Sequence, residues 1–122
     1  MKKTISVDFD GVIHAYSRGW QDGSVYDEPV PGAIEGLRAL MTSHVVVVST
    51  ARRDLLAVAK WLRLRGIHAV ADDGTISKWA KGDTVLVTNQ KLPAVAYLDD
   101  RAVRFLDWET VPAQLLDHGV LT

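Results

Sequence analysis

The sequence contains no cysteine, and this absence sets the first limits on the protein. Without thiols the chain forms no disulfide and no zinc–thiolate site, and a reducing compartment suits it. Its apolar runs are much shorter than the roughly 20 residues of a membrane helix, and no leader pattern precedes the first predicted strand. A formal net charge of −1 provides no broad basic surface for non-specific nucleic-acid binding. We therefore expect a soluble, cytoplasmic protein without a membrane partner.

Size and composition indicate a single globular domain that spans residues 1–122. Hydrophobic residues make up 48% and charged residues 24% of the chain, which is ordinary for such a domain. No internal repeat, low-complexity segment or interdomain linker divides it. A chain of this length buries roughly two thirds of its unfolded surface, so it can form one core without covalent staples.

The apolar pattern alternates between predicted strands and predicted helices. Strands are expected at about residues 3–9, 45–48, 67–71, 84–87 and 94–98, with a short one at 103–105. Helices are expected from about residue 32, over 54–65 and over 110–118. This order predicts an α/β, doubly wound, three-layer Rossmann-like domain with a central parallel sheet of about five strands and helices on each side.

Residues 11–31 form a long polar connection that glycines and prolines interrupt. Connections of this length are usually functional or mobile. The segment contains Tyr16, Trp20 and Tyr26, which allows two interpretations of about equal weight. The aromatic side chains either cover the end of the sheet, or they belong to a flap that admits substrate.

The first predicted strand ends in two acids, Asp8 and Asp10, which are followed by Gly11. Alternate residues of a strand share a face, so both carboxylates leave the strand end toward the same region. Such a pair is self-repelling unless a cation lies between its members. Gly11 allows the chain to turn and lets backbone amides approach a ligand. The pattern indicates phosphoryl chemistry assisted by Mg²⁺.

Two further strand ends carry polar groups. Asp99 and Asp100 form a second acid pair after a predicted strand, and Ser49, Thr50 and Arg52 follow the valine-rich strand. Each group alone is explained by a turn or a helix cap. Parallel sheets bind ligands beyond the carboxyl ends of their strands, where these groups would meet. Their clustering favours a metal site over coincidence.

In this order and at these strand ends, the motifs resemble those of the haloacid dehalogenase (HAD) superfamily over nearly the whole chain. The run from Asp8 to Val12 is similar to the first motif, Ser49 to the second, Lys91 to the third and the run from Tyr97 to Arg101 to the fourth. The Ser-x-x-Arg run from Ser49 and the Asp-Asp-Arg run from Asp99 also resemble small capless phosphatases, including the phosphatase domain of polynucleotide kinase-phosphatases and small phage and bacterial HAD hydrolases.

The resemblance implies a role for each acid. Asp8 would be the nucleophile that forms an aspartyl-phosphate, and Asp10 would move the proton to the leaving group and from water. A Mg²⁺ ion would be bound by Asp8, by the backbone carbonyl of Asp10 and by Asp100 or Asp99, with the remaining acid acting through water. The ion would offset repulsion between the nucleophile and the phosphate.

The resemblance also implies groups that hold the phosphate. Ser49 would bind a phosphoryl oxygen and Lys91 would neutralise developing charge, although Leu92 and not proline follows Lys91 directly. Lys78 and Lys81 are the alternatives for that lysine, and both also fit ordinary surface charges. His14 is close to the acids and is expected to be a packing or capping residue.

Further residues near the motifs are candidates for substrate contact. Gly11 and Thr50 could approach the phosphate, and Trp20 could stack on a base or sugar. Arg52 and Arg101 could grip a phosphate, or equally form structural ion pairs with Asp54 or Asp99.

The predicted function is that of a Mg²⁺-dependent phosphomonoesterase. Its site is expected to be open, because the connection after the first motif and the connection after the third predicted strand are both too short for a folded cap domain. Nucleotides, polynucleotide 3′-phosphates and small phosphate esters are the substrate classes considered, and the flap or a neighbouring subunit of a homo-oligomer would close the site. The alternative is a catalytically weak phosphate-binding or regulatory domain. Phosphotransferases of the superfamily share these motifs.

Overall fold

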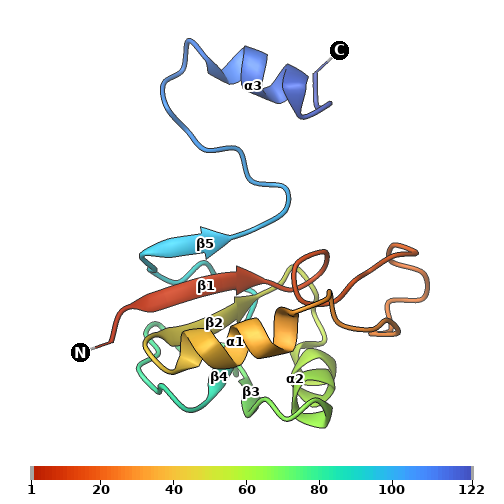
Figure 1. Ribbon diagram of the computed structural model, residues 1–122, viewed down its shortest axis with the longest axis vertical. Coiled ribbons are helices and arrows are strands. Elements are labelled where there is room, and N and C mark those ends of the chain that lie inside the picture. Colours follow the sequence, from red (N-terminus) through yellow and green to blue (C-terminus); the bar gives the residue numbers. More distant parts are fainter. Residues whose placement is uncertain (1, 122) are drawn as a thin grey trace.

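The computed structural model describes residues 2–121, which form five strands and three helices (Figure 1). In chain order these are β1 (Thr4–Asp8), α1 (Ala33–Met41), β2 (Val45–Ser49), α2 (Leu55–Leu64), β3 (Ala69–Ala71), β4 (Val85–Thr88), β5 (Ala96–Leu98) and α3 (Val111–Asp117). The strands pair in the order β3-β4-β2-β1-β5, and every pairing is parallel. The predicted α/β class and the central parallel sheet of five strands are confirmed.

Local sequence explains where α2 begins and ends. Asp54 precedes the helix, and its carboxylate accepts a hydrogen bond of 3.0 Å from the Ala57 amide, the usual N-cap arrangement. Gly66 follows the helix with a φ of 83°, a left-handed conformation that glycine adopts without strain. The predicted helix at 54–65 is therefore present with its capping residues in place.

Both helices in the body of the domain lie on the same face of the sheet. Ile34 and Leu37 of α1 and Val58 and Leu62 of α2 share one core cluster with the alternate strand residues that point toward them. The chain moves from β1 to β2 and then to β3 in one direction across the sheet, so right-handed crossovers place both helices on one side. The prediction of helices on each side is wrong for residues 2–121.

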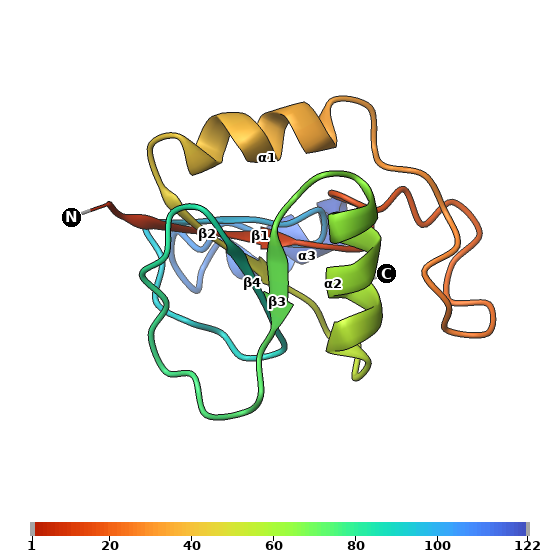
Figure 2. The ribbon, with the colours of Figure 1, turned by 90° about the horizontal axis from the view of Figure 1, so that it is seen from below.

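The opposite face is crossed by two connections that contain no helix. Residues 72–84 join β3 to β4, and residues 89–95 return from β4 to β5 in the reverse direction. Figure 2 shows α1 on one side of the strands and the first of these connections on the other. Trp79 and Leu92 from the connections contact Val47 and Leu86 in a second, smaller core cluster. This face therefore has less cover than the helical face.

The chain after β5 leaves the domain. The predicted strand at 103–105 is wrong, because these residues pair with no strand and Phe105 is 57% exposed. The predicted helix at 110–118 is present as α3, but none of its residues is buried and it contacts no other helix or strand of residues 2–121. Leu116 of this helix is 55% exposed. Figure 1 shows α3 standing clear of the sheet beyond β5.

No helix within residues 2–121 is long and apolar enough to cross a membrane.

Candidate metal and phosphate site

Three carboxylates gather at the carboxyl edge of the sheet. Asp8 ends β1, and Asp99 and Asp100 follow β5, which pairs directly with β1. One oxygen from each carboxylate lies within 4.8 Å of the others. The expectation that the two strand ends bring their acids together is met by Asp8, Asp99 and Asp100, while the Asp10 carboxylate lies outside this group.

The pKa of Asp8 is raised by its surroundings. Burial, together with the negative charges of Asp99, Asp100 and Asp10, raises the pKa of Asp8 from its ordinary 3.8 to about 6. A hydrogen bond from the Phe9 backbone opposes this shift. A divalent cation among the three carboxylates would remove their repulsion, and the exposed Asp99 and Asp100 leave room for the water ligands that Mg²⁺ retains. The donor set therefore fits Mg²⁺.

Gly11 is required at this edge for its lack of a side chain. Its φ is 86°, and a Cβ atom there would overlap Oδ2 of Asp100 and lie 3.0 Å from the carboxyl carbon. The Asp100 carboxylate therefore lies directly over the turn that follows β1. The predicted approach of the Gly11 backbone to a ligand stays a prediction, and the group that the structure places against Gly11 is the Asp100 carboxylate.

Asp10 belongs to a second constellation. Arg52 grips its carboxylate with two hydrogen bonds, Nε to Oδ2 at 2.8 Å and Nη2 to Oδ1 at 3.1 Å. His14 Nδ1 lies 2.8 Å from the same Oδ1. Arg52 and His14 are buried, while the Asp10 side chain is 22% exposed. A carboxylate held by two buried partners has a fixed orientation.

The hydrogen bonds of His14 determine its tautomer. The Asp27 backbone amide donates to Nε2 over 2.9 Å, so this nitrogen carries no proton. Nδ1 therefore carries the proton and donates it to Asp10. The ring also stacks on Phe9 with centroids 5.2 Å apart. His14 is the packing residue that was expected, and it additionally positions Asp10.

Arg52 links Asp10 to the 11–31 connection. Its Nη1 donates to the Gly23 carbonyl over 2.7 Å, and its guanidinium lies 5.0 Å from the centroid of the Trp20 ring. The ion pair weighed for Arg52 therefore exists, but its partner is Asp10 and not Asp54 or Asp99. Sequence patterns could not identify the pair, because the two residues are 42 positions apart.

The 11–31 connection is a loop whose two limbs are joined by hydrogen bonds. Ser17 donates two hydrogen bonds to Asp27, one from its amide and one from its hydroxyl. These bonds, with one from the Glu28 amide, lower the pKa of Asp27 to about 2. Tyr26 donates to the Gly19 carbonyl over 2.8 Å. Tyr16 and Tyr26 pack beside His14, whereas Trp20 is 54% exposed.

The predicted hydroxyl groups lie at the end of β2. Ser49 is in register with Asp8, so its side chain leaves the sheet on the same face as that carboxylate. Thr50 is buried, and its hydroxyl oxygen accepts a hydrogen bond of 3.1 Å from the Arg52 amide. Ser49 is therefore beside the proposed nucleophile, and Thr50 shapes the turn that carries Arg52.

The predicted cations do not pair with the acid cluster within residues 2–121. Lys91 is exposed, and its Nζ lies 5.0 Å from the centroid of the Tyr97 ring. Lys81 lies over Trp79 in the same way, at 5.6 Å. Arg101 donates its backbone amide to Asp99 over 2.8 Å and has an exposed side chain. Arg101 therefore shapes the turn that presents Asp99.

Arg52→Lys is expected to lower the free energy of unfolding by about 1–3 kcal/mol, because a lysine cannot replace a buried guanidinium that makes three hydrogen bonds. Arg53→Lys is the matched control, since Arg53 is exposed. Urea unfolding of both variants measures the difference. Equal stability of the two variants would show that the Asp10–Arg52 pair does not hold the loop.

No family model, curated protein or solved structure matches the chain.

Proposed function

We propose that this chain is a Mg²⁺-dependent phosphomonoesterase that works through an aspartyl-phosphate on Asp8. The observation that carries the proposal is the meeting of Asp8 with Asp99 and Asp100 at one edge of a parallel sheet. Three oxygen donors, one of them at the end of a central strand, suit a hard divalent cation beside a nucleophile. With the motifs described above, this arrangement supports a HAD-like assignment for a single capless domain.

In the first step, an oxygen of Asp8 forms a bond to phosphorus while the bond from phosphorus to the leaving oxygen breaks. The leaving oxygen needs a proton, for which Asp10 is the proposed donor. In the second step, water attacks the aspartyl-phosphate and Asp10 takes up the proton. Oδ2 of Asp10 accepts one hydrogen bond from Arg52, so it retains an acceptor position for this proton.

Bound Mg²⁺ would supply positive charge beside the transferring phosphoryl group. Ser49 is in register with Asp8 and would donate its hydroxyl to a phosphoryl oxygen. Lys91 would turn from the Tyr97 ring toward the same group. Exposure of Asp99 and Asp100 favours an open site, which suits a nucleotide, a polynucleotide 3′-phosphate or a small phosphate ester.

Phosphate release from an aryl phosphate tests the function. Purified protein with Mg²⁺ should release phosphate, and an excess of chelator should abolish the release. A parallel series with nucleotides, sugar phosphates and 3′-phosphorylated oligonucleotides would identify the substrate class. An absence of release from every member of the series in the presence of Mg²⁺ would contradict a phosphatase.

Mg²⁺ is expected to stabilise the fold above pH 6 and to lose this effect below it. Asp8 has a pKa of about 6 without metal, so protons displace the cation in acid. At about ten times its dissociation constant, Mg²⁺ would add about 1.4 kcal/mol to the free energy of unfolding. Thermal unfolding with and without Mg²⁺ measures this shift. Asp99→Asn should weaken it, whereas Asp83→Asn, a change of an exposed acid outside the cluster, should not.

A second candidate function is phosphate binding without efficient turnover. The contacts of Arg52 and His14 with Asp10 favour it, because their three hydrogen bonds occupy acceptor positions on the two carboxylate oxygens that a proton-transfer group would need. A protein of this kind would bind inorganic phosphate in the presence of Mg²⁺ but release none from esters. The two functions are distinguished by comparing phosphate binding, measured by calorimetry, with turnover of the same preparation.

A further inference from the structure

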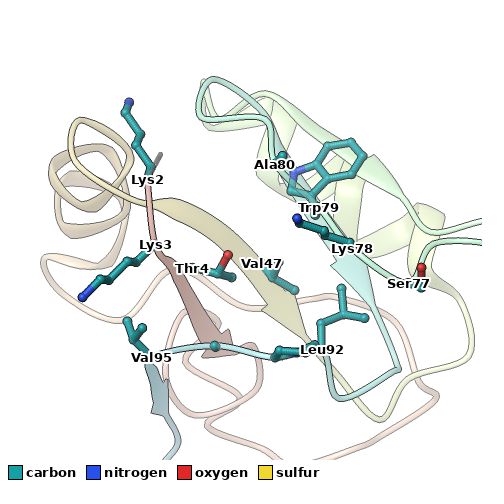
Figure 3. A pocket seen from close by; sticks show the side chains of 12 residues that line it. Lys2, Lys3, Thr4, Val47, Ser77, Lys78, Trp79, Ala80, Leu92 and Val95 are labelled. Carbon is teal, nitrogen blue, oxygen red and sulfur yellow. The ribbon is translucent and has the colours of Figure 1, made fainter.

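A groove opens on the face of the sheet that no helix covers. It has a volume of about 740 Å³ and lies between the start of β1 and the two connections that cross this face (Figure 3). Val47 and Thr4 form its floor, and Trp79, Leu92 and Val95 contribute apolar side chains to its walls. Parallel sheets are ordinarily covered on both faces, so an open apolar groove here marks an incomplete layer.

The groove has a basic rim. Figure 3 shows Lys3 and Lys78 on opposite sides of it, and Lys2 lies at the same end as Lys3. Among residues 2–121, no acidic side chain lines the groove. A ligand that fits must therefore be apolar along its length and acidic at its margins.

The C-terminal arm, residues 105–121, has this character. It carries Asp107, Glu109 and Asp117 and contains no lysine or arginine. Its large apolar side chains face solvent, with exposed fractions of 57% at Phe105, 63% at Leu106, 78% at Trp108, 55% at Leu116 and 65% at Val120. An apolar surface of this extent is unusual on a segment that remains in water. The arm therefore has the composition of a segment that packs against another surface.

We propose that two copies of this chain form a dimer in which the C-terminal arm of each copy fills the sheet groove of the other. The arm leaves its own domain at the edge strand β5, and its helix α3 contacts no other helix or strand of residues 2–121, which is the arrangement that an exchange of arms requires. In the dimer, α3 and the apolar residues before it supply the missing layer over the sheet.

The dimer would be isologous, because each copy contributes the same groove and the same arm. The acidic residues of the arm would lie against the lysines of the rim, and this charge pattern fixes the partner more than it adds affinity. The 12 residues that line the groove, together with the arm, supply roughly the 20–30 residues a side of a stable interface. The inference does not depend on the phosphatase proposal.

Sedimentation and native mass spectrometry of the full chain test the dimer. The wild-type protein is expected to be a dimer. A groove variant, Lys3→Glu with Lys78→Glu, should raise the dissociation constant at least about tenfold. An arm variant, Asp107→Lys with Glu109→Lys, should do the same. A control with two exposed changes on α2, Lys60→Glu with Arg63→Glu, should remain dimeric.

A mixture of the groove variant and the arm variant tests the exchange of arms most directly. The groove variant has an acidic groove that accepts the basic arm of the arm variant. The arm variant keeps a basic groove, which accepts the acidic arm of the groove variant. At a concentration where each variant alone dissociates to monomers, the mixture should therefore form a heterodimer whose mass lies between those of the two homodimers. Circular dichroism checks that the variants are folded. A wild-type monomer, or a dimer that neither variant weakens, would overturn the proposal, and a mixture that stays monomeric would contradict the exchange of arms.

Discussion

Replacement of Asp8 by asparagine is expected to lower the rate of phosphate release by about 10⁴-fold or more, because an amide cannot replace the attacking carboxylate. Asp8 ends a central strand of the sheet and is only partly exposed, so the substitution preserves shape and should leave the fold intact. Initial rates for the wild type and the variant, measured with the same substrate, give the ratio. Wild-type turnover in Asp8→Asn would contradict the assignment of the nucleophile.

Asp8→Asn is expected to lower activity but to raise the stability of the fold at neutral pH. The pKa of Asp8 is about 6 in the folded chain and 3.8 ordinarily, so the folded state binds the proton more tightly. The resulting stabilisation is present below pH 3.8 and is lost as the pH rises through 6. Since Asp8 is partly exposed, the loss is about 1–2 kcal/mol after allowance for solvent screening. In metal-free buffer at neutral pH, Asp8→Asn should therefore be the more stable protein, which distinguishes loss of chemistry from unfolding.

Replacement of Asp10 by asparagine is expected to lower the turnover rate by about 10²–10⁴-fold, the usual contribution of a general acid–base group. Because the second step also needs a base, the aspartyl-phosphate should accumulate in this variant. Burst kinetics measures the accumulation. A rate within a few-fold of wild type would contradict the proton-transfer role and would leave Asp10 as an anchor for Arg52.

Asp10→Asn also weakens the bonds to Arg52 and His14, so its control must loosen the loop without touching the acid. Asp27→Asn meets this need, because Asp27 accepts the two hydrogen bonds from Ser17 that tie the loop together. If both variants lose the same activity, the order of the loop matters and the acid does not. If only Asp10→Asn loses activity, proton transfer is supported.

The sequence predicted those features that depend on local pattern. The run Val45–Val48 is buried from both faces as its composition indicates, and the Asp54 cap and Gly66 bound α2 as expected. The meeting of Asp8 with Asp99 and Asp100 followed from one rule, that parallel strands end at the same edge. Each of these inferences used neighbouring residues or a general property of parallel sheets.

Features that depend on the path of the chain could not be predicted in the same way. The Asp10–Arg52 pair joins residues 42 positions apart, and each residue alone fits several partners. The strand order places α1 and α2 on one face of the sheet, and no periodicity in the sequence encodes this order. The predicted helix at 110–118 is present as α3 but none of its residues is buried. A helical pattern indicates that a face is to be covered without indicating what covers it.

The most direct test of the central claim is the location of a phosphoryl group on the protein. Asp10→Asn should be incubated with substrate and Mg²⁺, quenched in acid, and digested for mass spectrometry. We expect one phosphorylated residue, Asp8, whose phosphoryl group is released by hydroxylamine as an acyl phosphate requires. The phosphoryl group on Asp8 should be absent when the incubation contains chelator in place of free Mg²⁺. Turnover by the wild type with no phosphoryl group on Asp8, or with the group on another residue, would contradict the proposed mechanism.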